Sequence, residues 1–311
     1  MTESSSSVSL TGLRADVPLG FMAAMGLWRI LGSERDFKMS WIERRGSFHP
    51  VLHGEGVSAE VVKAACLEHL EKWPEQVLFG SRDAIKDCLN EELPDWRDRF
   101  PNLEDWFAAF CLEARSPGEK VEKTPLDMSF ARQKFLGDTL KLRTDLQKPR
   151  GKKAPTTAGL FEEALFGPWR YKDDCHSRGW DSSTLKEAAF THQEPSPMPN
   201  AGVTGAVWLA IHSLPCFPCY SDRGRLRPRG FTYRDEALHF SWPVWTPAIS
   251  MDAALVLLGQ VARIAGRGAG RPRQMDEAAE LKARGVLAVF ASERRKLTKY
   301  MVSLLAPERL M

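Results

Sequence analysis

The chain has 311 residues, of which 43% are hydrophobic and 27% are charged, so it has enough apolar material for a buried core and is not a disordered tail. Its longest apolar stretch, residues 18–31, contains Arg29 and is too short for a hydrocarbon layer of about 30 Å, so no membrane span is expected. The formal net charge is only +3, so a surface for a polyanion can arise only if the charge is spread unevenly along the chain.

Apolar periodicity and capping residues predict mostly helices, with a few strands, in the first 120 residues. Pro18 in a first helical turn, with Asp16 or Val17 as the cap, indicates a helix start. That helix is apolar on nearly every side, so we expect it to be buried. Ser58 is the expected cap of another helix. The expected elements are a strand at residues 8–13, helices at 18–31, 59–73 and 103–113, and a hairpin of strands 37–42 and 48–52.

The breaker sequence Ser-Pro-Gly-Glu-Lys at residues 116–120 is the predicted boundary between an acidic part, 1–118, and a basic part, 119–311. The boundary is soft, and the chain can equally form one domain. Beyond it we expect helices at 129–146, 157–166, 201–213, 251–264 and 276–284, a hairpin of 231–233 with 237–242, and a strand at 286–290. The sequence therefore predicts a helix-rich α+β fold with small antiparallel hairpins.

The charge is divided unevenly between these parts. Residues 1–120 contain 14 Lys and Arg against 20 Asp and Glu, a net charge of −6, whereas the remainder has a net charge of +9. The positive charge lies in three clusters that we expect in loops or at loop–helix junctions. Their candidate nucleic-acid-binding residues are Lys148, Arg150, Lys152 and Lys153 in the first cluster, Arg223, Arg225, Arg227, Arg229 and Arg234 in the second, and Arg267, Arg271 and Arg273 in the third.

Arginine dominates the second and third clusters, and its planar guanidinium binds phosphate oxygens bidentately. Phe231 and Tyr233, beside the second cluster, are expected to offer stacking faces for unpaired bases. We therefore expect the clusters to gather on one continuous surface that holds a polyanionic strand. The alternative is a set of solvated loops whose arginines pair with the acidic N-terminal part.

Other residues that could carry chemistry give weaker patterns. Cys216 and Cys219 form a Cys-x-x-Cys pair without two further ligands at zinc spacing, so we expect two packed thiols, and metal binding stays open. Asp173, Asp174 and Asp181 would be the carboxylates of a metal-dependent nuclease, but their spacing alone does not support one. We expect no catalytic residue, no cofactor and no enzymatic activity.

Six cysteines are too few for a disulfide scaffold, and residues 2–7 are polar and acidic where a signal peptide would be basic. A cytoplasmic location is therefore expected. The ten tryptophans could include stacking faces in the basic part, although burial is the more common fate of such large rings.

Several short segments together resemble a known group of proteins. They are Pro-Leu-Gly-Phe at residues 18–21, Ala-Met-Gly-Leu at 24–27, Phe-Gly-Pro-Trp at 166–169, Trp-Asp at 180–181 and Trp-Pro at 242–243. This series resembles poorly characterised CRISPR-associated proteins of the type I-G (formerly I-U) kind. The resemblance implies a nucleic-acid-binding subunit of an RNA-guided effector complex in antiviral defence, with guide RNA or target DNA and other subunits as partners. A metal-dependent nuclease, or a structural adaptor that docks on an acidic protein partner, remains the alternative.

Overall fold

The computed structural model describes residues 6–32, 35–73, 103–110, 124–128, 135–149, 155–184, 201–222, 225–234, 236–265, 272–298 and 301–311. These residues form an α+β fold with antiparallel strand pairs, which confirms the predicted class. The helices are α1 (Pro18–Gly32), α2 (Ala59–Lys72), α5 (Leu103–Phe110), α6 (Phe135–Gln147), α7 (Thr157–Phe166), α8 (Thr204–His212), α9 (Met251–Ala265) and α10 (Pro272–Ala283). None of the helices in these ranges is long and apolar enough to cross a membrane.

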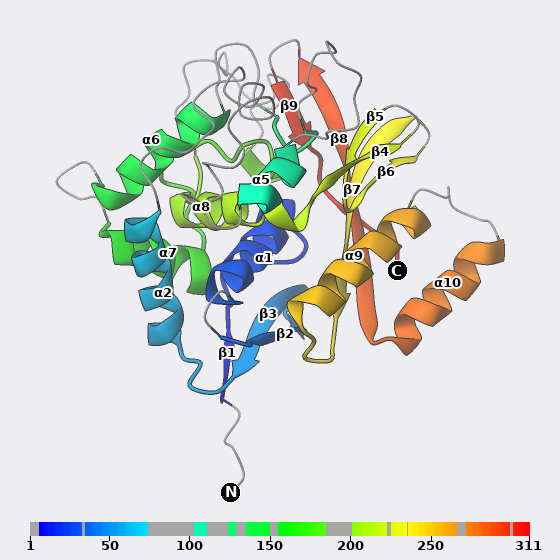
Figure 1. Ribbon diagram of the computed structural model, residues 1–311, viewed down its shortest axis with the longest axis horizontal. Helices are drawn as coiled ribbons and strands as arrows, with labels where there is room; N and C mark the ends of the chain where they lie inside the picture. The colour runs from blue at the N-terminus through cyan, green and yellow to red at the C-terminus, as the bar shows by residue number, and fades with distance from the viewer. Residues whose placement is uncertain are drawn as a thin grey trace, which may run out of the picture.

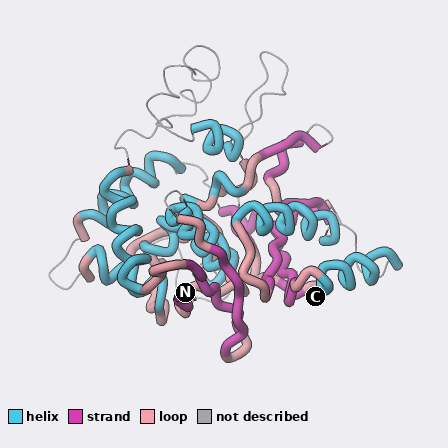
Figure 2. The backbone as a smooth tube through the Cα atoms, turned by 60° about the horizontal axis from the view of Figure 1, so that its bottom comes forward, coloured by secondary structure: helices cyan, strands magenta, loops and turns pink. Residues whose placement is uncertain are grey.

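The strands form three antiparallel groups. Strands β1 (Ser6–Ser9), β3 (Ser47–Gly54) and β2 (Lys38–Arg44) make a sheet in that order. A second sheet has the order β10 (Glu308–Arg309), β8 (Val286–Thr298), β7 (Ala237–Trp245) and β6 (Phe231–Arg234), and β9 (Met301–Leu304) also pairs with β8. Strands β4 (Cys219–Asp222) and β5 (Arg225–Pro228) form a two-stranded ribbon. Figure 2 shows the strands running through the middle of the molecule with helices on both flanks.

Most predicted elements are present. The β2–β3 and β6–β7 hairpins, the helix α7 and the helix after Ser250 are confirmed, and the Ser58 side chain caps α2 by accepting from the Val61 backbone N–H at 3.2 Å. Several predictions differ. The strand expected at residues 8–13 lies at Ser6–Ser9, and the helix expected from residue 276 begins at Pro272. The strand expected at residues 286–290 extends to Thr298, because β7 pairs with it as far as Arg294 and β9 pairs with it from there to Thr298. The second basic cluster, expected as a loop, is largely the β4–β5 ribbon.

Helix α1 is the centre of the core, as its all-round apolar sequence predicts. It lies between the helical side of the molecule and the sheets in Figure 1. Its Phe21 ring stacks at 5.9 Å from Trp41 of β2 and at 5.8 Å from Trp242 of β7. On the opposite side it packs against α8 so closely that a Cβ added to Gly26 would lie 1.8 Å from the Leu209 carbonyl oxygen. Only glycine fits this contact between two helix backbones.

The core contains buried residues from both the acidic and the basic part of the sequence. Two tryptophans of β7 connect these parts by hydrogen bonds. The Trp242 Nε1–H donates to the Ala15 carbonyl at 2.8 Å, and the Trp245 Nε1–H donates to the Met39 carbonyl at 2.8 Å. Both rings are fully buried, as the frequency of tryptophan in cores predicts. The boundary expected at residues 116–120 lies outside the described residues.

Candidate nucleic-acid interface

The three basic clusters are attached to different parts of the fold. Lys148 is exposed just after α6, and α6 lies on the opposite side of the molecule from β4, β5, α9 and α10 in Figure 1. Lys148 therefore follows a different part of the fold from the one that carries the second and third clusters. The ribbon and α9 are joined through β6, which contacts both. Arg273 lies within α10. The predicted residues outside the described ranges are Arg150, Lys152, Lys153, Arg223, Arg267 and Arg271.

The β4–β5 ribbon packs part of one face on the core and exposes Tyr220 on the other. Its ladder pairs Tyr220 with Arg227, and in the ladder Asp222 lies opposite Arg225. Because side chains alternate along a strand, the residues between these pairs point to the other face. Cys219 and Leu226 on that face are buried, at 7% and 8% exposure. The Cys219 thiol also donates to the Ala109 carbonyl of α5 at 3.1 Å, which anchors the ribbon on the core.

Arg227, on β5, and Arg229, just after its end, have different environments. The Arg227 guanidinium lies 4.9 Å from the centre of the Tyr220 ring, and its Nη1 lies 3.1 Å from the Asp222 Oδ2. Arg229 instead donates from Nη1 to the Cys216 carbonyl at 3.4 Å. Within the described ranges no carboxylate pairs with Arg229, so its positive charge is not neutralised locally.

Arg234, the last member of the second cluster, is held between two side chains. Its guanidinium forms an ion pair with Glu308 of β10, and its Nη2 lies 3.1 Å from the His239 Nε2. Burial lowers the pKa of His239, and the Arg234 charge acts in the same direction. Arg227 and Arg234 therefore pair with carboxylates, but the carboxylates come from the basic part of the chain. The sequence interpretation had placed them in the acidic N-terminal part.

The aromatic faces of this region differ from those expected. Phe231 is fully buried and its ring stacks on Phe240 at 5.0 Å, so the expectation that it stacks on bases is wrong. Tyr233 is half-buried on β6. The exposed ring is that of Tyr220, at 38% exposure, which sequence reasoning missed. The alternation of Tyr220 with the apolar Cys219 is the sequence signal that could have indicated a strand with Tyr220 exposed, but the sequence predicted a loop here.

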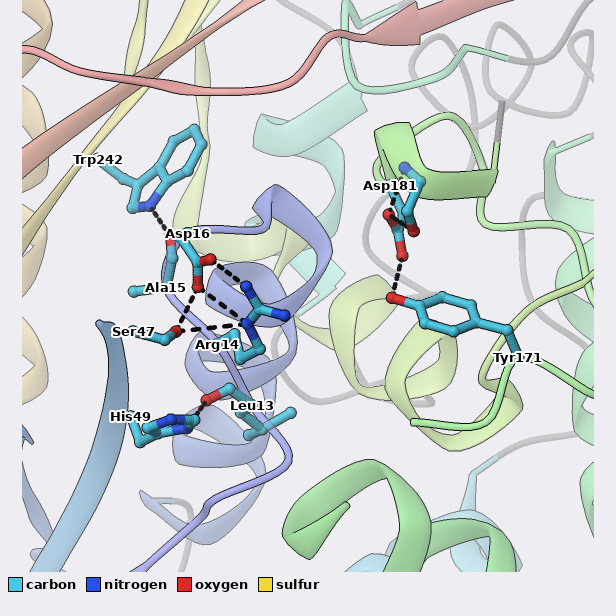
Figure 3. Close-up of polar contacts among 10 residues, drawn as sticks. Leu13, Arg14, Ala15, Asp16, Ser47, His49, Tyr171, Asp181 and Trp242 are labelled. Atoms are coloured by element: carbon cyan, nitrogen blue, oxygen red, sulfur yellow. Dashed lines mark hydrogen bonds and ion pairs between the residues drawn. The ribbon is translucent and has the colours of Figure 1, made fainter. Parts of the chain in front are cut away.

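The carboxylates considered for a nuclease do not converge. Asp173 accepts from the backbone N–H and the hydroxyl of Thr204 at 2.9 and 2.6 Å, and so caps α8. Asp181 is 1% exposed and accepts from the Tyr171 hydroxyl at 3.1 Å, as Figure 3 shows. Asp174 lines a separate cavity of about 270 Å³. In the part of the chain that the structure describes, no three His, Cys, Asp or Glu side chains form a group that could hold a metal ion.

A second polar network in Figure 3 fixes the loop before α1. Asp16 accepts from Arg14 and from the Ser47 hydroxyl, and His49 Nδ1 lies 3.0 Å from the Leu13 carbonyl oxygen. Burial would raise the pKa of Asp16, but the hydrogen bonds from Arg14 and Ser47 outweigh burial and hold the pKa below its ordinary value. The carboxylate therefore stays ionised and joins this loop to β3.

Cys216 and Cys219 are both buried and neither forms a disulfide, which confirms the expected packing of this pair. Burial raises the pKa of Cys216 to about 12, so the thiol is protonated at neutral pH and is not a nucleophile.

Comparison of the sequence with protein-family models and with curated proteins finds no match. The site is therefore defined by its own geometry. A ribbon anchored on the core carries an exposed tyrosine and a paired arginine, and it is followed by an arginine that has no carboxylate partner among the described residues.

Proposed function

We propose that this chain is a non-enzymatic nucleic-acid-binding protein whose β4–β5 ribbon contacts the ligand. The observation that carries the proposal is the open face of the ribbon, where Tyr220 and Arg227 lie together and Arg229 follows at the end of β5. Arginine and an exposed aromatic ring are the two groups that bind nucleic acids without reading a sequence. The net charge of +9 over residues 121–311 would attract a polyanion to this part of the molecule.

Arg229 is the best candidate for a phosphate contact among the described residues of the second cluster. Arg227 and Arg234 each have a carboxylate partner, so binding a phosphate would require them to exchange one anion for another. Arg229 has no such competitor within the described ranges. Its guanidinium keeps donors beyond the one bonded to the Cys216 carbonyl, and these suit phosphate oxygens.

A salt titration tests the proposal. Binding of labelled single-stranded RNA and DNA is measured by fluorescence anisotropy over a range of salt concentrations, for the wild type and Arg229→Ala. Loss of one phosphate contact should lower the slope of log K against log salt concentration by about 0.7 to 0.9.

Arg44→Ala is the matched control, because Arg44 is exposed at the end of β2 in the acidic part, and β2 belongs to a different sheet from the ribbon. The control should keep the wild-type slope. If nucleic acid does not bind at low salt, or if both variants keep the wild-type slope, the proposal is wrong.

The resemblance to type I-G CRISPR-associated proteins supports a narrower proposal, that the protein is a subunit of an RNA-guided effector complex in antiviral defence. In such a complex base pairing with a guide reads the sequence, while protein subunits hold the backbone. Purification of the tagged protein from its own host should then recover short guide RNA and partner subunits. Recovery of the protein alone would contradict this assignment.

One observation favours a second candidate function, a structural adaptor for an acidic protein. Arg229, which has no carboxylate partner within the described ranges, could bind a carboxylate of such a partner as well as a phosphate. Purification with a protein partner and without nucleic acid would favour the adaptor. A metal-dependent nuclease is not proposed, because Asp173 and Asp181 are engaged in hydrogen bonds that hold the fold together.

A further inference from the structure

The aromatic ring of Tyr220 is partly exposed to solvent. Tyr220 is 38% exposed, which makes it more open than the other aromatic side chains whose burial the structure describes. Along β4, Cys219 is buried and Asp222 is half-buried, whereas Ser221 is exposed like Tyr220. An aromatic ring on a rigid, core-anchored strand has little conformational freedom to lose when a flat ligand lies against it. The ring is therefore a pre-formed surface for a planar group.

The Arg227 guanidinium lies over one face of the Tyr220 ring and holds the ring in place. The two residues are directly opposite in the β4–β5 ladder, and the Arg227 Cζ lies 4.9 Å from the ring centre. Asp222 holds the guanidinium in that position through the contact of 3.1 Å between Nη1 and Oδ2. Because the Arg227 side chain is only 19% exposed, it is engaged mainly within the protein. We therefore assign Arg227 as a positioning residue for Tyr220 and not as a phosphate ligand.

We infer that Tyr220 is a stacking platform for an unpaired base, so that the ligand of the ribbon is single-stranded and not duplex nucleic acid. This inference rests on the proposed function. In a duplex, neighbouring bases cover both faces of each base, whereas a base in a single strand can turn outward and lie on an aromatic ring. Every base has such a face, so this contact requires no particular sequence.

The test compares Tyr220→Leu with Tyr220→Phe. Binding is measured for a single strand of about 12 nucleotides, within the site size of known single-strand binders, and for a duplex of the same sequence. Loss of one stacked base should weaken single-strand binding about 5- to 150-fold in Tyr220→Leu. Tyr220→Phe should bind nearly as the wild type, because it keeps the ring.

Val256→Ala is the control, since Val256 is an exposed apolar side chain on another element, α9. It should leave binding unchanged. Thermal unfolding of Val256→Ala should match the wild type, because Val256 is 59% exposed, and thermal unfolding of the Tyr220 variants shows that they are folded at the temperature of the binding assay.

Arg227→Met separates positioning from phosphate contact. If Arg227 positions the ring, this variant should bind more weakly but keep the wild-type salt slope, whereas loss of a phosphate contact would lower the slope by about 0.7. Quenching of a 2-aminopurine base in the oligonucleotide reports stacking directly, and it should fall in Arg227→Met even at saturating protein concentration. A lowered slope or unchanged quenching overturns the positioning role.

The failure of this inference is distinct from that of the proposed function. If the protein binds nucleic acid but Tyr220→Leu matches the wild type, or if duplex binds as tightly as single strand, only the stacking platform is wrong. If neither strand form binds at low salt, the proposed function is itself wrong.

Discussion

Acid should destabilise the fold through a pair of histidines, one half-buried and one fully buried. His69 of α2 and His212 of α8 lie with the His69 Nε2 3.3 Å from the His212 Nδ1. Trp73, Trp106 and Trp208 surround the His212 ring, at centroid distances of 5.3, 5.8 and 4.6 Å. His212 is fully buried, and its Nε2 has no hydrogen-bond partner among the described residues. A protonated ring at this position would be a buried charge without compensation.

The magnitude follows from the pKa of His69. Burial, with a smaller contribution from the charge of Arg29, lowers this pKa from 6.5 to about 4, and burial lowers the pKa of His212 in the same direction. Below pH 6.5 the unfolded chain takes up a proton at His69, whereas the folded chain stays neutral there until about pH 4. The free energy of unfolding is therefore at its full value above pH 6.5 and falls as the pH drops toward 4. The shift corresponds to about 3 kcal/mol for His69 alone.

Urea unfolding followed by tryptophan fluorescence at several pH values between 6.5 and 4 measures this loss. The variant His69→Gln has no titrating ring at this position, so its stability should fall less than that of the wild type. His53→Gln is the control. Burial also lowers the pKa of His53, but this side chain lies on β3, away from the His69–His212 pair. Equal pH dependence in the wild type and His69→Gln would refute the assignment of acid sensitivity to this pair.

Three substitutions test the packing and are followed by urea or thermal unfolding. Gly26→Ala should lower the free energy of unfolding by about 1–3 kcal/mol or more, because the added Cβ forces α1 and α8 apart. Gly32→Ala is the control and should leave the free energy of unfolding unchanged, because nothing lies within 4 Å of its added Cβ. Similar stabilities of the two variants would contradict the close contact. Trp242→Phe should cost about 1–3 kcal/mol because it leaves the buried Ala15 carbonyl without its donor, and an unchanged midpoint would show that this hydrogen bond contributes nothing. Ser58→Ala should cost about 1 kcal/mol through loss of the α2 cap, which Ser58→Thr should largely retain.

The sequence by itself predicts the helices and local hairpins well, because their signals lie within a few residues. Pro18 marks the start of α1, Ser58 that of α2, and Ser250 that of α9. The dipeptide Gly-Pro at residues 167–168 ends α7 at Phe166, where it was expected to end. In each case the residue that supplies or blocks a backbone hydrogen bond is next to the helix end that it determines.

The state of each arginine depends on contacts that no local pattern contains. Arg234 pairs with Glu308 only because β6 and β10 belong to one sheet. Phe231 looks like a free aromatic beside a basic cluster, yet the ladder places it against Phe240 in the core. Tyr220 becomes the open ring because Cys219 faces α5.

Composition and charge therefore determined that the basic part of the chain could attract a polyanion. Tertiary structure decided which of its arginines are neutralised and which aromatic ring reaches solvent. The physical reason is that ion pairs and strand faces are set by residues distant in sequence, which only the folded chain brings within contact distance.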